Sequence, residues 1–161
     1  MLIATALRAA WGRVSQPLLN DTAQDALTGL PTRGAGQAVV DALQKGDAVA
    51  MIDLDGLKAT NDTLGHAAGD NELIALAKHL AAGVRRGDTV TRWGGDEFVV
   101  VLRGGGETGV AVIDRLRASS PAGFSAGIAV HGAGAGNDTL AAADAALLAA
   151  KRAGGSRVVT A

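Results

Sequence analysis

The sequence contains no cysteine. Disulfides, thiolate metal sites and cysteine nucleophiles are therefore excluded, and metal chemistry is left to oxygen ligands and a hard cation such as Mg²⁺. Aromatic residues are also scarce, at 2% of the chain against 48% hydrophobic residues. The core must be built from Val, Leu, Ile and Ala. A bound purine base is expected to be recognised by hydrogen bonds, because few rings are available for stacking.

Neither sign of charge is in clear excess, since 15 Lys and Arg face 16 Asp and Glu. This balance gives no general attraction to nucleic acid or to an anionic membrane, so we expect no polymeric nucleic acid as a partner. The apolar opening from Met1 to Leu7 is far shorter than the ~20 residues of a membrane span, and no basic segment precedes it. We therefore predict no membrane segment in this chain and a cytoplasmic location.

The length of 161 residues suits a single domain. Residues 1–24 form a lead in which apolar positions between Leu2 and Val14 recur at helical spacing, so we expect a helix that packs on its own domain or contacts a second copy. The main domain covers residues 25–161. Its patterns predict helices over 32–45, 73–84, 107–117 and 137–153, and strands over 48–52, 88–91, 99–102, 124–130 and, at an edge, 157–160. This alternation without repeats predicts an α+β or α/β sandwich.

A short glycine-rich segment lies between two of the predicted strands and carries two adjacent acids. The flanking β-branched and apolar runs predict a β-hairpin whose turn falls in Arg92–Phe98. Gly94 and Gly95 let the backbone turn and let a bulky ligand approach the main chain. Asp96 and Glu97 place two carboxylates at the tip, which suits a metal-bound phosphate. A solvated hairpin tip is the alternative that this short motif leaves open on its own.

A second acidic position follows the apolar run Ala48–Ile52, which is typical of a central strand. Asp53 comes directly after this run. Burying a charge without a partner costs several kcal/mol, so a carboxylate at the end of a buried strand is better explained by function than by packing. The glycine-punctuated segment 56–70 follows and carries polar side chains able to hydrogen-bond a base. His66 within it is, on its own, more typical of a structural role.

Several separated segments together resemble the GGDEF family of diguanylate cyclases, over the stretch from Asp25 to Val159. They are Asp25–Pro31, Asp53–Lys58, Asn61–His66, Gly69–Asp70, Arg92–Phe98, Ser125–Ile128, and Ala143–Asp144 with Lys151. The resemblance implies an α+β fold with a palm-like (ferredoxin- or nucleotide-cyclase-like) βαββαβ core. In such a fold a central, antiparallel-containing sheet is flanked by helices, and the Gly-Gly-Asp-Glu-Phe turn sits on the central hairpin.

The resemblance implies condensation of two GTP molecules into cyclic di-GMP with release of two pyrophosphates. Each domain of a homodimer would hold one GTP, and the 3′-hydroxyl of each GTP would attack the α-phosphate of the other. The family uses two Mg²⁺ (or Mn²⁺) ions per active site, and two-metal phosphoryl transfer needs carboxylates placed close together to hold them. The implied metal ligands are Asp53, the backbone carbonyl of Leu54, Asp96 and Glu97. Of these, Asp53, Asp96 and Glu97 are the implied catalytic residues, with Asp96 helping to deprotonate the hydroxyl.

The same resemblance implies a set of GTP-binding residues. They are Lys58, Asn61, His66, Asp70, Gly94, Gly95 and Lys151. Asn61 and Asp70 match the guanine readers, and a carboxylate can accept hydrogen bonds from the ring N–H and exocyclic amine of guanine, which adenine does not offer in that form. The two lysines match positions that contact the triphosphate as point charges.

An Arg-x-x-Asp string at Arg85–Asp88 is, by itself, common at solvated helix ends. Its offset from Gly94 is that of the product-inhibition site of the family, and Arg115 matches the basic residue that joins it. The resemblance therefore implies that Arg85, Asp88 and Arg115 bind cyclic di-GMP and lower activity, since arginine forks suit phosphates and guanine faces.

The chain departs from the usual family pattern at Thr32, Leu57 and Leu148. After Lys151, the usual Gly-Arg-Asn ending is replaced by the segment from Gly154 through Gly155 to Arg157. None of these changes removes an implied metal ligand or guanine reader, so an active cyclase is favoured. Two alternatives stay open: a non-catalytic module that binds cyclic di-GMP or GTP, and a structural dimerisation domain. The activating signal is not encoded in any recognisable sensor segment.

Overall fold

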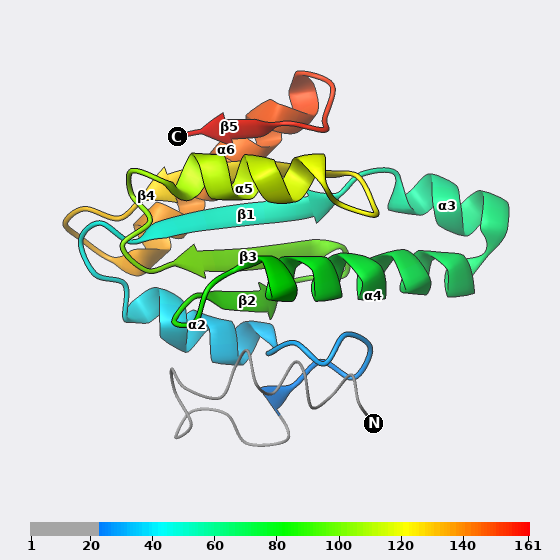
Figure 1. Ribbon diagram of the computed structural model, residues 1–161, viewed down its shortest axis with the longest axis horizontal. Coiled ribbons are helices and arrows are strands. Elements are labelled where there is room, and N and C mark those ends of the chain that lie inside the picture. Colours follow the sequence, from blue (N-terminus) through cyan, green and yellow to red (C-terminus); the bar gives the residue numbers. More distant parts are fainter. Residues whose placement is uncertain (1–22) are drawn as a thin grey trace.

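The computed structural model describes residues 23–161, so the expected lead helix between Leu2 and Val14 lies outside the described part. One five-stranded sheet has the order β2-β3-β1-β4-β5 (Figure 1). The strands are β1 (Ala48–Leu54), β2 (Thr89–Arg92), β3 (Glu97–Leu102), β4 (Phe124–Val130) and β5 (Val158–Thr160). The helices are α2 (Arg33–Asp41), α3 (Leu57–Leu64), α4 (His66–Gly83), α5 (Gly109–Ala118) and α6 (Gly136–Arg152). No helix in this range is long and apolar enough to span a bilayer.

The order of elements along the chain is that of a βαββαβ core with one helix and one strand added. The strand β1 leads into the helix pair α3 and α4, then come the hairpin β2–β3, the helix α5 and the strand β4. Strands β1 to β4 pair antiparallel, and β5 pairs parallel with β4 at the sheet edge. The predicted α+β palm-like fold and the predicted edge strand are confirmed.

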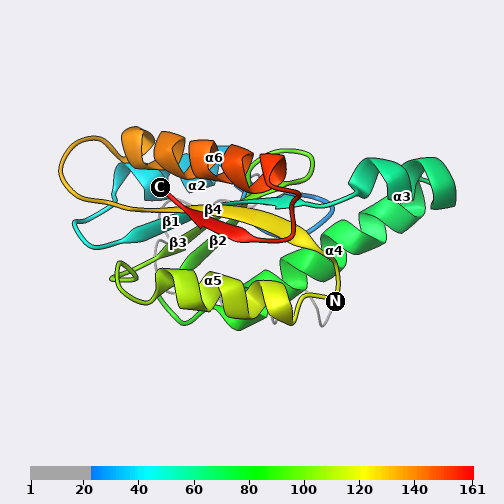
Figure 2. The ribbon, with the colours of Figure 1, turned by 90° about the horizontal axis from the view of Figure 1, so that it is seen from above.

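Helices cover both faces of the sheet, with α2 and α6 on one side and α4 and α5 on the other (Figure 2). Successive residues of a strand point to opposite faces. In β1, Ala50 and Ile52 belong to the cluster under α4 and α5, whereas Val49 and Met51 belong to the cluster under α2 and α6. The next residue of this second series is Asp53, so its carboxylate points toward α6.

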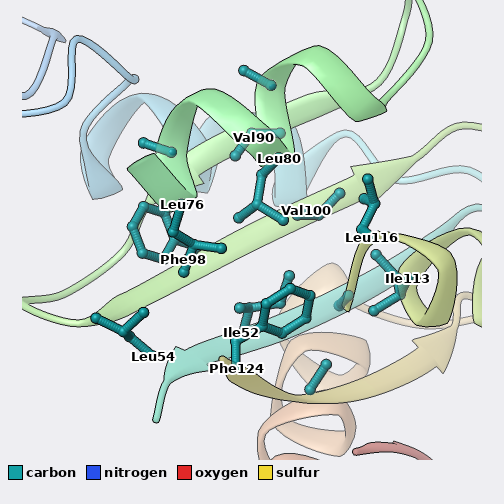
Figure 3. Close-up of a cluster of buried hydrophobic side chains, with 14 of the residues drawn as sticks. Ile52, Leu54, Leu76, Leu80, Val90, Phe98, Val100, Ile113, Leu116 and Phe124 are labelled. Carbon is teal, nitrogen blue, oxygen red and sulfur yellow. The ribbon is translucent and has the colours of Figure 1, made fainter. Parts of the chain in front are cut away.

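The larger cluster contains both phenylalanines of the chain, Phe98 and Phe124, and both are 0% exposed (Figure 3). Aliphatic side chains from α4 and α5, among them Leu80 and Ile113, close over them. Burying one such side chain contributes roughly 1.5–3 kcal/mol. The core is therefore aliphatic with two rings, as the composition indicated, and it fixes the strand ends that carry the acidic residues.

Two helical segments differ from the sequence prediction. The helix expected over 32–45 ends at Asp41, because Asp47 draws the chain away: its carboxylate accepts the N–H of Gln44 at 2.8 Å. The segment 56–70, expected only to be polar and glycine-punctuated, contains α3 and the start of α4. No residue of α3 is buried, so it shows no apolar periodicity in the sequence. Gly56 and Gly65, at φ 72° and 89°, bound this helix.

The helices α3 and α4 form a hairpin that extends beyond the end of the sheet (Figures 1 and 2). It begins where β1 ends, immediately after Asp53–Asp55. A Cβ on Gly69 would lie 1.8 Å from Oδ1 of Asn61, so glycine leaves room for the Asn61 side chain in its present position. The hairpin thus places polar side chains beside the acidic end of β1.

Gly127 in β4 sets how closely α6 packs on the sheet. A Cβ there would lie 2.1 Å from both the carbonyl oxygen of Ala143 and the backbone nitrogen of Leu147. We expect Gly127→Ala to lower the free energy of unfolding by about 3 kcal/mol, because backbone atoms cannot move aside as a flexible side chain would. The matched control is Gly123→Ala, since a Cβ there meets nothing within 4 Å. Urea denaturation curves with equal midpoints for the two variants would contradict this account.

Candidate active site

The carboxylates of Asp53, Asp96 and Glu97 lie at the same end of β1 and β3, and we call these three residues the acidic cluster. Asp53 lies in register with Glu97 of β3 on one side and with Ser125 of β4 on the other. The backbone N–H of Leu54 donates to the carbonyl of Asp96 at 3.0 Å, which ties the end of β1 to the hairpin turn. The register and this bond therefore place Asp53 and Leu54 beside Asp96 and Glu97, although more than 40 residues separate the two pairs in the sequence.

The Asp53 side chain is only 13% exposed, and its two oxygens have different surroundings. Oδ2 lies 2.9 Å from Nζ of Lys151. Oδ1 is buried and has no hydrogen-bond partner among residues 23–161. Burial of the carboxylate, reinforced by the nearby charge of Asp96, raises the pKa of Asp53 to about 6 despite the lysine. A buried acceptor without a donor is costly, and either a proton shared with Asp96 or a bound cation relieves that cost.

The residues present fit a divalent metal that is shared with a phosphate ligand. Within the described range, no three acidic or histidine side chains are close enough to hold a metal by themselves. Asp53 offers its unpaired Oδ1, and Asp96 is close enough for its charge to act on it. Mg²⁺ is commonly bound through one or two carboxylates with substrate phosphates completing the shell. The donor set matches that arrangement.

Arg92 holds the glycine turn of the hairpin in place. Its Nε donates to the carbonyl of Gly94 at 3.2 Å and its Nη2 to the carbonyl of Gly95 at 2.8 Å. Its Nη1 donates to both carboxylate oxygens of Asp25, at 3.1 and 3.0 Å. A Cβ on Gly94 would lie 2.8 Å from Oε2 of Glu97, so glycine leaves room for that carboxylate. The turn and the segment at Asp25 are thus clamped by one guanidinium.

Asp25 is anchored from the other side by Thr28, whose N–H and hydroxyl both donate to Oδ2. Although burial acts in the opposite direction, these bonds and the Arg92 ion pair lower the pKa of the Asp25 carboxyl. The sequence contains both residues as ends of separate motifs, but nothing local shows that they meet. The pairing is a contact missed by sequence reasoning.

The predicted base-recognition residues lie on the α3–α4 hairpin. Asn61 is on α3, and its Oδ1 is buried with no hydrogen-bond partner in the described part of the chain. Asp70 follows Gly69, the residue packed against Asn61, and its side chain is exposed. Lys58 and His66 are exposed on the same hairpin. An amide and a carboxylate are therefore available on the two packed helices that follow β1.

A second carboxylate after β1 has a structural task that the sequence did not reveal. Asp55 accepts the hydroxyl of Ser125 at 2.7 Å and the N–H of Ser156 at 3.0 Å. Ser125 Oγ also accepts the Ser156 N–H, at 2.9 Å. This network fastens the turn after α6 to β1 and β4. The only signal in the sequence is that Asp55 and Ser125 both belong to the resembling motifs.

The departures from the family pattern can now be placed. Arg157 donates from Nε to the carbonyl of Gly155 at 3.1 Å and so stays within its own turn. Leu57 packs partly buried against the larger core cluster. Leu148 is 48% exposed, and Thr32 is the residue before α2. None of the four contacts the acidic cluster through a hydrogen bond among the described residues.

The Arg-x-x-Asp residues precede β2, at the end of the β2–β3 hairpin that is opposite its turn. Arg85, Asp88 and Arg115 line one hollow of about 320 Å³. Asp88 is buried and accepts the N–H groups of Arg85, at 3.2 Å, and Arg103, at 2.9 Å. Burial raises the pKa of its carboxyl. The guanidinium of Arg85 donates to the carbonyl of Arg103, and that of Arg115 to the carbonyl of Gly83. The structure thus groups the three predicted residues.

The sequence matches the family described as "Diguanylate cyclase, GGDEF domain" over residues 22–157. The chain belongs to the GGDEF family. It is 39% identical to the diguanylate cyclase DgcP of Pseudomonas aeruginosa over 155 residues, which cover 83% of this chain and 23% of that protein. It is 35% identical to the diguanylate cyclase DgcM of Escherichia coli K12 over 167 residues, which cover 92% of this chain and 41% of that protein. The chain thus spans less than half the length of these relatives.

Solved structures with the same fold include GGDEF domains. The GGDEF domain of DgcB from Caulobacter crescentus, in complex with c-di-GMP, has a TM-score of 0.79 and 26% identity, covering 88% of this chain and 97% of that one. The diguanylate cyclase SiaD of Pseudomonas aeruginosa, in complex with its activator SiaC, has a TM-score of 0.80 and 30% identity. That match covers 99% of this chain and 70% of SiaD. The family assignment made from the sequence motifs is confirmed.

Because the pKa of Asp53 is raised, we expect the stability of the protein to depend on pH. The folded protein binds a proton at Asp53 more tightly than the unfolded chain, whose carboxyl keeps its ordinary pKa of 3.8. Stability should therefore fall as the pH rises between about 4 and 6, and should stay lower above that window. Without metal, Asp53→Asn should be more stable than the parent at pH 7.5 by on the order of 1 kcal/mol, and this part of the pH slope should disappear.

Denaturation in a chelator at pH 4.5 and 7.5 measures both effects. The control is Asp144→Asn, an exposed aspartate on α6. The account fails if Asp53→Asn is the less stable protein at pH 7.5, or if its pH slope equals that of the parent.

Proposed function

We propose that this GGDEF domain is a diguanylate cyclase that condenses two GTP molecules into cyclic di-GMP and two pyrophosphates. The observation that carries the proposal is the largely buried Asp53, whose Oδ1 lacks a donor among residues 23–161 and which lies beside Asp96 at the end of the hairpin. Packing gives no reason for this arrangement, because two neighbouring carboxylates at a largely buried position are destabilising while both are ionised. Phosphoryl transfer gives one, since it requires clustered carboxylates.

Asp53, Asp96, Glu97 and the carbonyl of Leu54 would hold two Mg²⁺ or Mn²⁺ ions. Such ions polarise the reacting phosphate and stabilise the charge that develops on the leaving pyrophosphate. The 3′-oxygen of one GTP forms a bond to the α-phosphorus of the other, and the bond from that phosphorus to the pyrophosphate breaks. Asp96 accepts the proton of the attacking hydroxyl. The 3′-oxygen of the second GTP then attacks the α-phosphorus of the first in the same way, which releases the second pyrophosphate and closes the ring.

Binding and selectivity are assigned to the surrounding residues. Lys58 and Lys151 supply positive charge to the triphosphate. Gly94 and Gly95 leave the backbone of the turn open to the phosphates. Asn61 and Asp70 would hydrogen-bond the guanine edge, and the buried, unpaired Oδ1 of Asn61 supports this role. His66, at the start of the same hairpin helix, completes the proposed GTP-binding residues.

The reaction requires two domains face to face, because each domain presents only one GTP. We therefore propose a homodimer as the active species. The lead over residues 1–24, proposed as a possible contact between copies, lies almost entirely outside the described residues. A relative of known structure, SiaD, is described in complex with an activator. A partner that brings two copies together is accordingly a second route to the same dimer.

The hollow between Arg85, Asp88 and Arg115 is the proposed site for inhibition by cyclic di-GMP. Two arginines border it, and the buried Asp88 fixes the loop through two backbone N–H groups. Arginine forks suit phosphate oxygens. The hollow also favours a second candidate function, a receptor module that binds cyclic di-GMP without making it. The assay below separates the two.

The purified protein should convert GTP and Mg²⁺ into cyclic di-GMP, with specific activity that rises with protein concentration as dimers form. Asp96→Asn should lower the rate at least about 100-fold, because it removes a metal ligand and the proton acceptor. The control is Glu107→Gln, an exposed residue before α5. ATP should give no cyclic product. If chromatography detects no product at any protein concentration while the protein still binds added cyclic di-GMP, the protein is a receptor and the cyclase proposal is wrong.

Product inhibition should depend on Arg85. We expect Arg85→Ala to keep the initial rate and to raise the concentration of cyclic di-GMP needed for half-inhibition by about 10-fold or more, since a charge-assisted contact is lost. Arg86→Ala, which changes the exposed neighbour, should behave like the parent. Equal inhibition of both variants by added cyclic di-GMP would show that the product acts elsewhere.

A further inference from the structure

Lys151 contacts Asp53 because the buried face of α6 and the face of β1 that is turned toward α6 end at these two residues. Ala143, Leu147 and Lys151 are spaced four residues apart and share one face of α6, and the first two are buried against the sheet. On β1, Val49 and Met51 face α6, and Asp53 is the next residue of that series. The ammonium and the carboxylate therefore end in contact, with Nζ 2.9 Å from Oδ2.

Lys151 is the cation of the acidic cluster. Besides its contact with Asp53, its ammonium lies within the electrostatic influence of Asp55 and Asp96. In the described range it is the only basic side chain that forms an ion pair with Asp53. The lysine side chain is 36% exposed, whereas that of the aspartate is 13% exposed. The ammonium neutralises part of the charge that a divalent ion would otherwise neutralise.

A metal ion and this ammonium would repel each other across the same carboxylate. A Mg²⁺ ion binds carboxylate oxygen at about 2.1 Å. With Nζ 2.9 Å from Oδ2, a metal on that oxygen would lie at most about 5 Å from the ammonium, and a metal on the unpaired Oδ1 would still share the same 13% exposed carboxylate with it. Their repulsion lowers the affinity for metal for as long as the lysine stays.

We propose that Lys151 is a positioning residue that competes with the metal ion for Asp53 and is drawn away by the triphosphate of a bound nucleotide. The metal then binds well only together with the nucleotide. This inference rests on the proposed function, because it assumes that Asp53 is a metal ligand and that a triphosphate is the substrate. It adds a coupling between the two ligands that the site residues alone do not imply.

The structure allows the side chain to move while the helix stays in place. Lys151 has a flexible four-carbon stem with a rotatable ammonium. The turn that follows α6 is fastened by the bonds from Ser156 to Asp55 and Ser125, and the N–H of Gly155 donates to the carbonyl of Ala150 at 3.0 Å. The end of α6 is thus fixed on both sides of the lysine. Exchange of partners requires only rotation of the side chain.

The test measures binding of Mn²⁺ to the full chain by the loss of the electron paramagnetic resonance signal of free Mn²⁺. Titrations are made without nucleotide and with guanosine 5′-[α,β-methylene]triphosphate, which cannot be cleaved at the reacting bridge. Lys151→Met should bind Mn²⁺ at least about 10-fold more tightly than the parent without nucleotide, because the competing charge is gone. The nucleotide analogue should then improve Mn²⁺ affinity less than it does in the parent.

Two controls separate this effect from a general change of charge. Lys151→Arg keeps a cation at the carboxylate and should stay within about twofold of the parent. Arg152→Met removes the neighbouring exposed charge of α6 and should also stay within about twofold. If Lys151→Met does not fold by circular dichroism, Lys151→Gln takes its place with the same expectation.

Equal affinity of Lys151→Met and the parent for Mn²⁺ without nucleotide would overturn the inference. The cyclase assay of the parent, run in parallel, distinguishes the two levels of the argument. If the parent makes cyclic di-GMP while the variant shows no gain in Mn²⁺ affinity, only the competition by Lys151 is wrong. If the parent neither makes product nor binds Mn²⁺ with the nucleotide analogue, the proposed function fails and the inference fails with it.

Discussion

The burial of one carboxylate, that of Asp53, is the constraint on which the arrangement of this domain depends. The strand β1 must be apolar on both faces to run through the centre of the sheet, and it must still deliver an acid at its end. Gly127 lets α6 approach the sheet closely enough for Lys151 to reach that acid. Asp55 then fastens the turn beyond α6. Close packing of α6 and neutralisation of Asp53 are therefore one structural solution.

The hairpin β2–β3 separates two charged regions that serve different purposes. Its turn is held by Arg92, which donates to the carbonyls of Gly94 and Gly95 and to neither Asp96 nor Glu97. Its other end carries the buried Asp88, whose carboxylate is satisfied by two backbone N–H groups. The strand β3 spans six residues, or roughly 20 Å at the usual rise. The two regions lie too far apart to share a ligand of ordinary size.

The sequence was sufficient for the strands and the family, because short apolar runs and motifs are local signals. It was insufficient for α3, whose polar surface gives no periodicity, and for the end of α2, which is set by a bond to Asp47. The contacts of Arg92 with Asp25 and of Lys151 with Asp53 join residues 67 and 98 positions apart. Such pairs depend on sheet order and register, which no local pattern encodes.

The cost of the acidic cluster favours an enzyme over a receptor. A receptor that binds cyclic di-GMP through Arg85, Asp88 and Arg115 would gain stability by replacing Asp53 with a neutral side chain, since nothing at the hollow touches that residue. The chain instead keeps a carboxylate whose pKa is raised to about 6 by burial and by Asp96, and whose Oδ1 has no donor within residues 23–161. One lysine offsets only part of that cost. A proton relieves the remainder at low pH and a bound cation relieves it near neutral pH, and a cation beside a triphosphate is what nucleotide condensation requires.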